Sequence, residues 1–148
     1  MKKVSLFITS CLFIMALFQT NLQAQTDKPY TDGPVWMISF VKTKTGMSDT
    51  YLKDLAMHWA KYLKVAKERG IIMDFKAIGT SAANPADWEL MLMIEVKNFA
   101  AIDDIDKKMD ALAVEILGPD DKQQENRVNR NSYRDILGEK LGREIIFK

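Results

Sequence analysis

Apolar residues along this chain change their spacing from one segment to the next, and the spacing predicts alternating strands and helices. Helical spacing of three and four residues runs from Ser48 to Arg69 and again over about 99–117. A glycine closes each of these runs, Gly70 and Gly118. Shorter apolar runs typical of strands predict four strands, at about 35–43, 71–79, 88–97 and 143–147.

The region before the last predicted strand is less clearly patterned. Between Asp120 and Ser132 the one strongly apolar residue is Val128, so we expect either a solvated loop or an exposed helix. The following residues, 133–141, are expected to form a short helix. Three aliphatic side chains of that helix would point inward: Ile136, Leu137 and Leu141.

The predicted strand at 88–97 has two different faces. One face is purely apolar and is expected to meet the helices, and the other carries methionines in its middle and acids at its ends. The strand at 35–43 is apolar on both faces, which suits a central position in the sheet. The apolar face of 88–97 consists of Trp88, Leu90, Leu92, Ile94 and Val96, and the other face of Glu89, Met91, Met93 and Glu95.

The element order is therefore β-α-β-β-α-β, with an extra segment before the final strand. That order predicts an α+β, ferredoxin-like domain over 35–148, with two helices on one face of a four-stranded antiparallel sheet. At this level the chain resembles the dimeric α/β-barrel superfamily. That group includes antibiotic-biosynthesis-type monooxygenases, haem-degrading monooxygenases and stress-responsive barrel proteins. No catalytic motif of these families matches residue by residue, so the resemblance implies the fold and a homodimeric barrel but no active site.

The N-terminus has the three-part plan of a secretory signal peptide. Lys2 and Lys3 precede an apolar core over 4–18, and a polar stretch then ends at Ala24, where cleavage is expected. The apolar core is shorter than the roughly 20 residues that span a bilayer, which disfavours the alternative of a retained anchor. A lipoprotein signal at Cys11 is the other alternative, although the apolar core continues past that residue.

Cleavage near Ala24 would leave a nearly neutral, cysteine-free protein. It removes two of the 21 basic residues, so 19 basic residues face 20 acidic ones, and it also removes the single cysteine. This balance gives no electrostatic signal for nucleic acid or for an anionic membrane. We expect a periplasmic or secreted domain without disulfides, preceded by a flexible leader at 25–34.

The single histidine, His58, lies in the first predicted helix near three aromatic residues. One interpretation places it in an apolar ligand pocket between helix and sheet, as a proton shuttle or a haem ligand. The other is a half-exposed histidine hydrogen-bonded to Asp54, four residues earlier, or to solvent. The ligand-pocket candidates are His58, Tyr62, Trp59 and Trp36.

Three methionines, Met37, Met91 and Met93, are predicted to share the sheet face away from the helices. Such a face forms either a dimer interface, which we favour, or an adaptable apolar cavity. Arg127, Arg130, Arg134 and Arg143 form a basic cluster near the end, expected to pair with neighbouring acids.

Motifs for metals, phosphates and nucleophilic catalysis are absent from the sequence, so no metal or other cofactor is expected. Two classes of function remain. The first is an exported protein that binds a small apolar molecule, or a cofactor-independent enzyme similar to monooxygenases. The second is a non-catalytic dimer that serves as an interaction or stress-related module.

Overall fold

The computed structural model describes residues 28–148, so the predicted signal peptide lies outside the described residues. Tertiary contacts divide the chain into two units. The described part of the smaller unit comprises residues 28–31 and Ile146–Lys148, where the Lys148 amide donates a hydrogen bond of 3.0 Å to the Pro29 carbonyl. The larger unit, Asp32–Ile145, contains the helices and the core.

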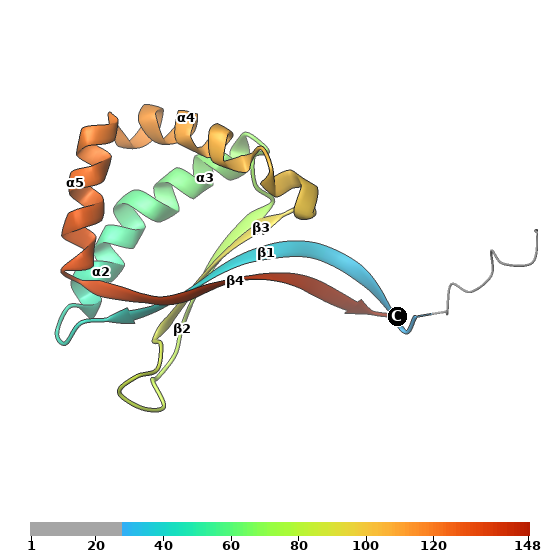
Figure 1. Ribbon diagram of the computed structural model, residues 1–148, viewed down its shortest axis with the longest axis horizontal. Helices are drawn as coiled ribbons and strands as arrows, with labels where there is room; N and C mark the ends of the chain where they lie inside the picture. The colour runs from blue at the N-terminus through green and yellow to red at the C-terminus, as the bar shows by residue number, and fades with distance from the viewer. Residues whose placement is uncertain (1–27) are drawn as a thin grey trace, which may run out of the picture. The chain divides into compact units, whose positions relative to one another are not determined.

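The larger unit is built on a four-stranded antiparallel sheet with the strand order β2-β3-β1-β4. Figure 1 shows the helices on one face of this sheet. Among residues 28–148, no helix covers the opposite face. The domain is therefore α+β. The strands are β1 (Tyr30–Thr43), β2 (Asp74–Gly79), β3 (Leu90–Val96) and β4 (Arg134–Phe147).

The first helical run is interrupted by a π-helical segment. It consists of α2 (Ser48–Asp54), the π-helix η2 (Leu55–Ala60) and α3 (Lys61–Glu68). The run ends as predicted at Gly70, whose φ of 68° is a left-handed conformation that favours glycine. Among the apolar residues with helical spacing in this run, Leu55 and Leu63 are buried, whereas Leu52 is exposed.

The second helical run also divides into parts. Asn98 accepts a hydrogen bond from the Ala101 amide and so caps the 3-10 helix η3 (Phe99–Ile102), as its side chain predicts. Helix α4 (Ile105–Leu117) follows and ends at Gly118, where φ is 95°. Then comes α5 (Asp120–Asn131), which has no buried residue. The exposed-helix alternative for this polar region is therefore correct.

The helix expected over 133–141 is wrong, because these residues belong largely to β4. Gly138 and Gly142 lie within β4 and each disfavours a helix by roughly 1 kcal/mol relative to alanine. Hydrogen bonding to the neighbouring strand β1 decides the conformation instead. At the other end of the chain, β1 begins at Tyr30, so residues 30–34, expected to be leader, are strand.

The core lies between the sheet and the helices and contains two clusters of buried residues. The first cluster joins Val35 and Val96 of the sheet to Leu63 of α3 and Leu112 of α4. The second consists of Val41, Tyr51, Leu55, Leu90 and Leu92. Four of the five residues of the predicted apolar face therefore meet the helices. The fifth, Trp88, precedes β3, and its ring contacts Phe40 on the face away from the helices.

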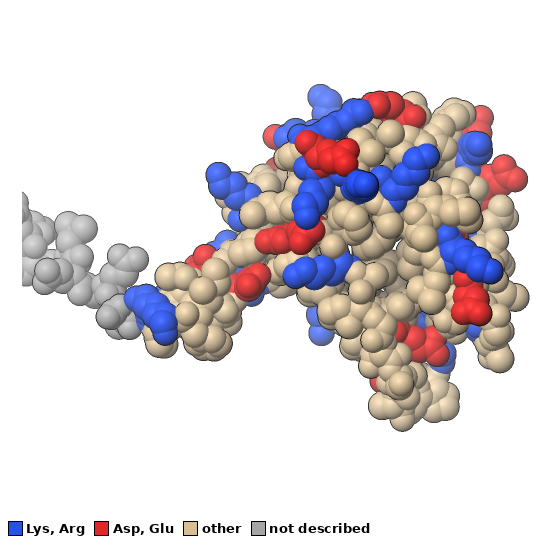
Figure 2. Space-filling view, turned by 180° about the vertical axis from the view of Figure 1, so that it is seen from behind, with Lys and Arg blue, Asp and Glu red and all other residues tan. Residues whose placement is uncertain are grey.

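Two further features of the described residues bear on function. Within residues 28–148, no helix has the length and apolar character needed to cross a bilayer. On the face drawn in Figure 2, basic and acidic side chains are mixed over the surface, and neither sign gathers into one large patch.

Candidate functional site

Trp59 determines the direction in which His58 points. Trp59 packs against both core clusters, and its ring meets Phe75 of β2 edge to face at 5.4 Å. Adjacent side chains on a helix point in different directions, so the packing of Trp59 against the core turns its neighbour toward the side of the helix. His58 therefore lies beside the core and is half-buried, with 34% of its side chain exposed.

His58 is held by Asp54, one turn earlier on the same helical run. Its Nδ1 atom lies 2.9 Å from Asp54 Oδ1 and 3.2 Å from the Asp54 backbone carbonyl oxygen. A carbonyl oxygen accepts hydrogen bonds and cannot donate them, so Nδ1 carries the proton. The neutral ring then keeps Nε2 as a hydrogen-bond acceptor and proton acceptor.

A small charged cluster connects this helix to α5 and β4. Arg130 Nη1 lies 4.0 Å from Asp54 Oδ2, and the Arg134 guanidinium lies 5.7 Å from the centre of the Tyr51 ring. Burial raises the pKa of the Tyr51 phenol, and the nearby cations of Arg134 and Arg130 oppose that rise. The cluster therefore places two arginines beside a buried phenol and a carboxylate that is 14% exposed.

Three buried polar atoms of this cluster have no hydrogen-bond partner among residues 28–148: Asp54 Oδ2, Arg130 Nε and Arg134 Nε. Buried polar groups are normally satisfied by protein or by ordered water. Of these three residues, Arg130 and Asp54 also line cavities, so their unsatisfied groups are suited to bind water or a ligand.

Two cavities meet at His58. One has a volume of about 50 Å³ and the other about 340 Å³, and both are lined by His58 and Asn126. We call the two together the His58 cleft. The smaller cavity is also lined by Leu117, Gln123, Arg127 and Arg130, and the larger by Thr50, Lys53, Asp54, Met57, Asn129 and Tyr133.

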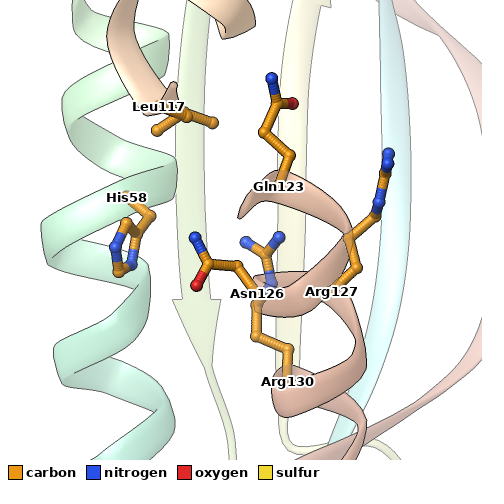
Figure 3. A pocket seen from close by; sticks show the side chains of 6 residues that line it. All are labelled: His58, Leu117, Gln123, Asn126, Arg127 and Arg130. Carbon is orange, nitrogen blue, oxygen red and sulfur yellow. The ribbon is translucent and has the colours of Figure 1, made fainter. Parts of the chain in front are cut away.

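The polar face of α5 forms one wall of the His58 cleft. Gln123, Asn126 and Arg130 are half-buried, whereas Arg127 and the intervening residues are exposed. Figure 3 shows His58 and the Asn126 amide facing each other, with the Arg130 guanidinium beside Asn126. Gln123 Nε2 also donates a hydrogen bond of 2.7 Å to the Gly118 carbonyl, which ties the start of α5 to the end of α4.

The structure does not bring the four predicted pocket residues together. Trp59 and Tyr62 pack in the core, where the Tyr62 hydroxyl donates a 2.7 Å hydrogen bond to the Met109 carbonyl. Trp36 pairs with Glu95 on β3 and belongs to the sheet face away from the helices. Its indole donates a 3.1 Å hydrogen bond to Glu144 of β4. Of the four, His58 alone lines the cleft.

The three predicted dimer-face methionines are also divided between the two faces. Met91 and Met93 pair with Phe40 and Ile38 on the face away from the helices. Met37 pairs with Ile94 and packs against the first core cluster, so it lies on the helix-covered face instead. The sequence did not distinguish the two faces of β1 because both are apolar, and a shift of one residue exchanges them.

The residues missed by the sequence analysis are those of α5. Asn126 and Arg130 are four residues apart, so a helix over this region places both side chains on one face. The expected pairing of the C-terminal arginines with neighbouring acids is not what the structure has. Arg130 instead approaches Asp54, and Arg143 donates a 3.0 Å hydrogen bond to Asp32.

A separate, open cavity of about 480 Å³ lies at the other side of α2. Hydroxyl groups of Thr43, Ser48, Thr80 and Ser81 line it, together with Glu89. Glu89 accepts hydrogen bonds from the Thr43 hydroxyl and amide, which lower the pKa of its carboxyl group. No group of three His, Cys, Asp or Glu side chains in the described part of the chain is arranged to hold a metal ion.

Comparison with known protein families, with characterised proteins and with solved structures finds no match to this chain. The function is therefore inferred from the geometry of the His58 cleft itself.

Tyr62 provides a pH-dependent test of the packing behind the cleft. Burial, with a smaller contribution from the Asp110 carboxylate, raises the pKa of Tyr62 to about 12. The folded chain therefore holds this proton to higher pH than the unfolded chain. The resulting stabilisation is complete below about pH 10 and is lost as pH rises from about 10 toward 12.

We expect Tyr62→Phe to reduce the free energy of unfolding by about 1 kcal/mol at pH 7, through loss of the hydrogen bond to Met109. The difference between wild type and variant should narrow above pH 10 and change sign before pH 12, because the ionisation favoured by the unfolded wild type outweighs the hydrogen bond. Urea unfolding at pH 7, 10 and 11.5 measures it, and Tyr51 is present in both proteins, so its titration cancels. A difference that stays constant with pH would contradict the burial of this phenol.

Proposed function

We propose that the protein binds a small polar molecule in the His58 cleft. The observation that carries this proposal is the hydrogen bond from His58 Nδ1 to Asp54, which orients the ring and leaves Nε2 for a ligand. His58 also lines both cavities of the cleft. Cavities of about 300 Å³ or more with a few convergent polar groups are the usual form of small-molecule sites.

The composition of the walls favours a polar ligand over the apolar one expected from the sequence. Leu117 and Met57 contribute apolar surface, but most lining side chains are amides, hydroxyls or charged groups. The aromatic residues that would have made an apolar pocket are used elsewhere, with Trp59 and Tyr62 packed in the core.

The π-helix supports the same assignment. π-Helical segments are rare and occur frequently at functional sites, because the added residue changes the direction of neighbouring side chains. Here η2 contains both Trp59 and His58 and follows Asp54 directly. The cleft is thus formed at the irregular part of the first helical run.

The proposal extends to proton transfer but does not require it. In the neutral ring the Asp54 contact leaves Nε2 as the atom that accepts a proton. This arrangement suits His58 as a general base toward a bound hydroxyl or water. The oxygenase-like chemistry implied by the family resemblance is not part of the proposal.

His58→Ala should separate a binding role from a structural one. We expect the variant to lose binding in the cleft while its free energy of unfolding in urea falls by no more than about 1 kcal/mol, because one half-exposed hydrogen bond is removed. Native mass spectrometry of protein purified from its own host measures the retained small molecule. We also propose that the protein is exported, so the chain mass in the same spectrum should show cleavage near Ala24.

Ser81→Ala is the matched control, because Ser81 lines the separate cavity and should keep the retained mass. The binding proposal is wrong if His58→Ala and wild type carry the same molecule in equal amount, or if wild type carries none. A loss of several kcal/mol in His58→Ala would instead make His58 a structural residue.

We also propose that the domain follows the ferredoxin-like plan with α5 as an addition. Support for the plan is the position of β3 between β1 and β2, which is the split βαβ arrangement.

We further propose that two copies assemble through the sheet face away from the helices. Support for assembly is the apolar content of the uncovered face, where paired residues of β1, β2 and β3 gather: Ile38, Phe40, Ile78, Met91 and Met93. Large apolar faces are seldom left open in soluble monomers.

The double variant Met91→Lys and Met93→Lys should shift the protein from dimer to monomer or aggregate, because it places two charges in the proposed interface. Light scattering measures the molar mass. The control is Met47→Lys with Met73→Lys, which adds the same charge at two exposed methionines outside that face. An unchanged dimer in the first variant would show that the interface lies elsewhere.

A further inference from the structure

We infer that the ligand of the His58 cleft is an anion, a molecule carrying a carboxylate or a phosphate, and that α5 supplies its recognition through Arg130 and Arg127. This inference rests on the proposed function, because it names the class of ligand for the same cleft.

The charges that line the cleft have one dominant sign. The smaller cavity is lined by two guanidinium groups, those of Arg127 and Arg130, and by no carboxylate among its lining residues. The larger cavity adds one cation, Lys53, and one carboxylate, Asp54. Because the lining residues include three cations and one acid, the cleft has a positive potential that favours a bound anion.

The acid in the cleft is already engaged. Asp54 Oδ1 accepts the His58 hydrogen bond, and Asp54 Oδ2 lies 4.0 Å from Arg130 Nη1, beyond hydrogen-bonding distance. Asp54 therefore offsets part of the charge of Arg130 without satisfying its N–H donors. A ligand carboxylate or phosphate would bring acceptor oxygens to those donors.

Arg130 is suited to this role by its burial and its planar group. Its side chain is 20% exposed, and its Nε atom is buried without a hydrogen-bond partner in the described chain. A largely covered cation with an unmet Nε donor is costly unless an acceptor binds it. Guanidinium groups bind carboxylates and phosphates through two parallel hydrogen bonds, which are shorter and stronger than neutral ones.

The remaining polar groups orient the anion. Figure 3 shows the Asn126 amide beside the Arg130 guanidinium and turned toward His58, so an ion held by Arg130 would also be within the reach of the amide. Arg127 Nε donates a 3.2 Å hydrogen bond to Gln124, which leaves the terminal nitrogens of that guanidinium for a ligand. His58 lines the same cleft, and its Nε2 would accept a hydrogen bond from a hydroxyl or water that accompanies the anion.

The test is a titration of the full chain, followed by ¹H–¹⁵N NMR, with three probes: benzoate, benzamide and inorganic phosphate. Benzoate and benzamide have nearly the same shape and differ in charge. We expect benzoate or phosphate to shift the signals of His58, Asn126 and Arg130, and benzamide to bind at least tenfold more weakly. Comparing benzoate with phosphate decides which anion the cleft selects.

Arg130→Gln should weaken binding of the anion about 10- to 100-fold, the effect of losing a charged hydrogen bond. Since Arg130 also approaches Asp54, the exposed Arg127→Gln is the second variant and should weaken binding by a smaller factor without unfolding the chain. The control is Arg69→Gln, which removes the same charge from an exposed pair with Glu115 and should leave binding unchanged.

Three outcomes would overturn the inference. Equal binding of benzoate and benzamide in the cleft would refute the anion class while leaving the cleft as a binding site. Equal weakening by Arg69→Gln and Arg130→Gln would show that net charge, and not the cleft, attracts the probe. If no probe shifts the cleft signals, the anion inference is wrong, and the proposed function is then decided separately by the mass retained in native spectra.

Discussion

The packing of Trp59 against both core clusters is the constraint on which the functional half of this structure depends. Its side chain packs against both core clusters, so it links the sheet interior under α3 and α4 to the interior under α2. A large indole in that position fixes the rotation of the helical run about its axis. The neighbouring His58 is consequently turned to the side of the helix, where Asp54 and α5 are within reach.

The cleft lies where apolar packing gives way to polar contacts. Helix α5 buries none of its residues, so the apolar core does not hold it in place. Its attachment is polar, through the Gln123 hydrogen bond to Gly118 and the approach of Arg130 to Asp54. A helix with no buried residue has low local stability, and elements of low local stability are those that move when ligands bind.

Much of the fold was predictable from the sequence, because periodic apolar spacing identifies elements whose burial decides their conformation. Leu90, Leu92 and Val96 meet the helices as expected, and Gly70 and Gly118 follow the ends of their helices. The β4 strand was missed in its first half because pairing with β1 is a non-local interaction that local spacing does not report.

The site was predictable only in part, for the same physical reason. The Asp54 contact of His58 is local and follows from a four-residue spacing on one helix. The contribution of Arg130 and Asn126 arises from a helix more than 60 residues away in sequence, which no local pattern joins to His58. Trp36 and Met37 were assigned to the wrong faces of β1 because both faces are apolar, and only the register with β3 distinguishes them.

The position of the proton on the His58 ring tests this account most directly. His58 is the single histidine of the chain, so a long-range ¹H–¹⁵N correlation spectrum of imidazole nitrogens contains one assignable ring. With the ring neutral, the account predicts a proton on Nδ1, donated to Asp54, and a free Nε2 whose signal shifts when a ligand enters the cleft. A proton on Nε2, together with a spectrum that is the same in wild type and Asp54→Asn, would contradict the hydrogen bond from His58 Nδ1 to Asp54.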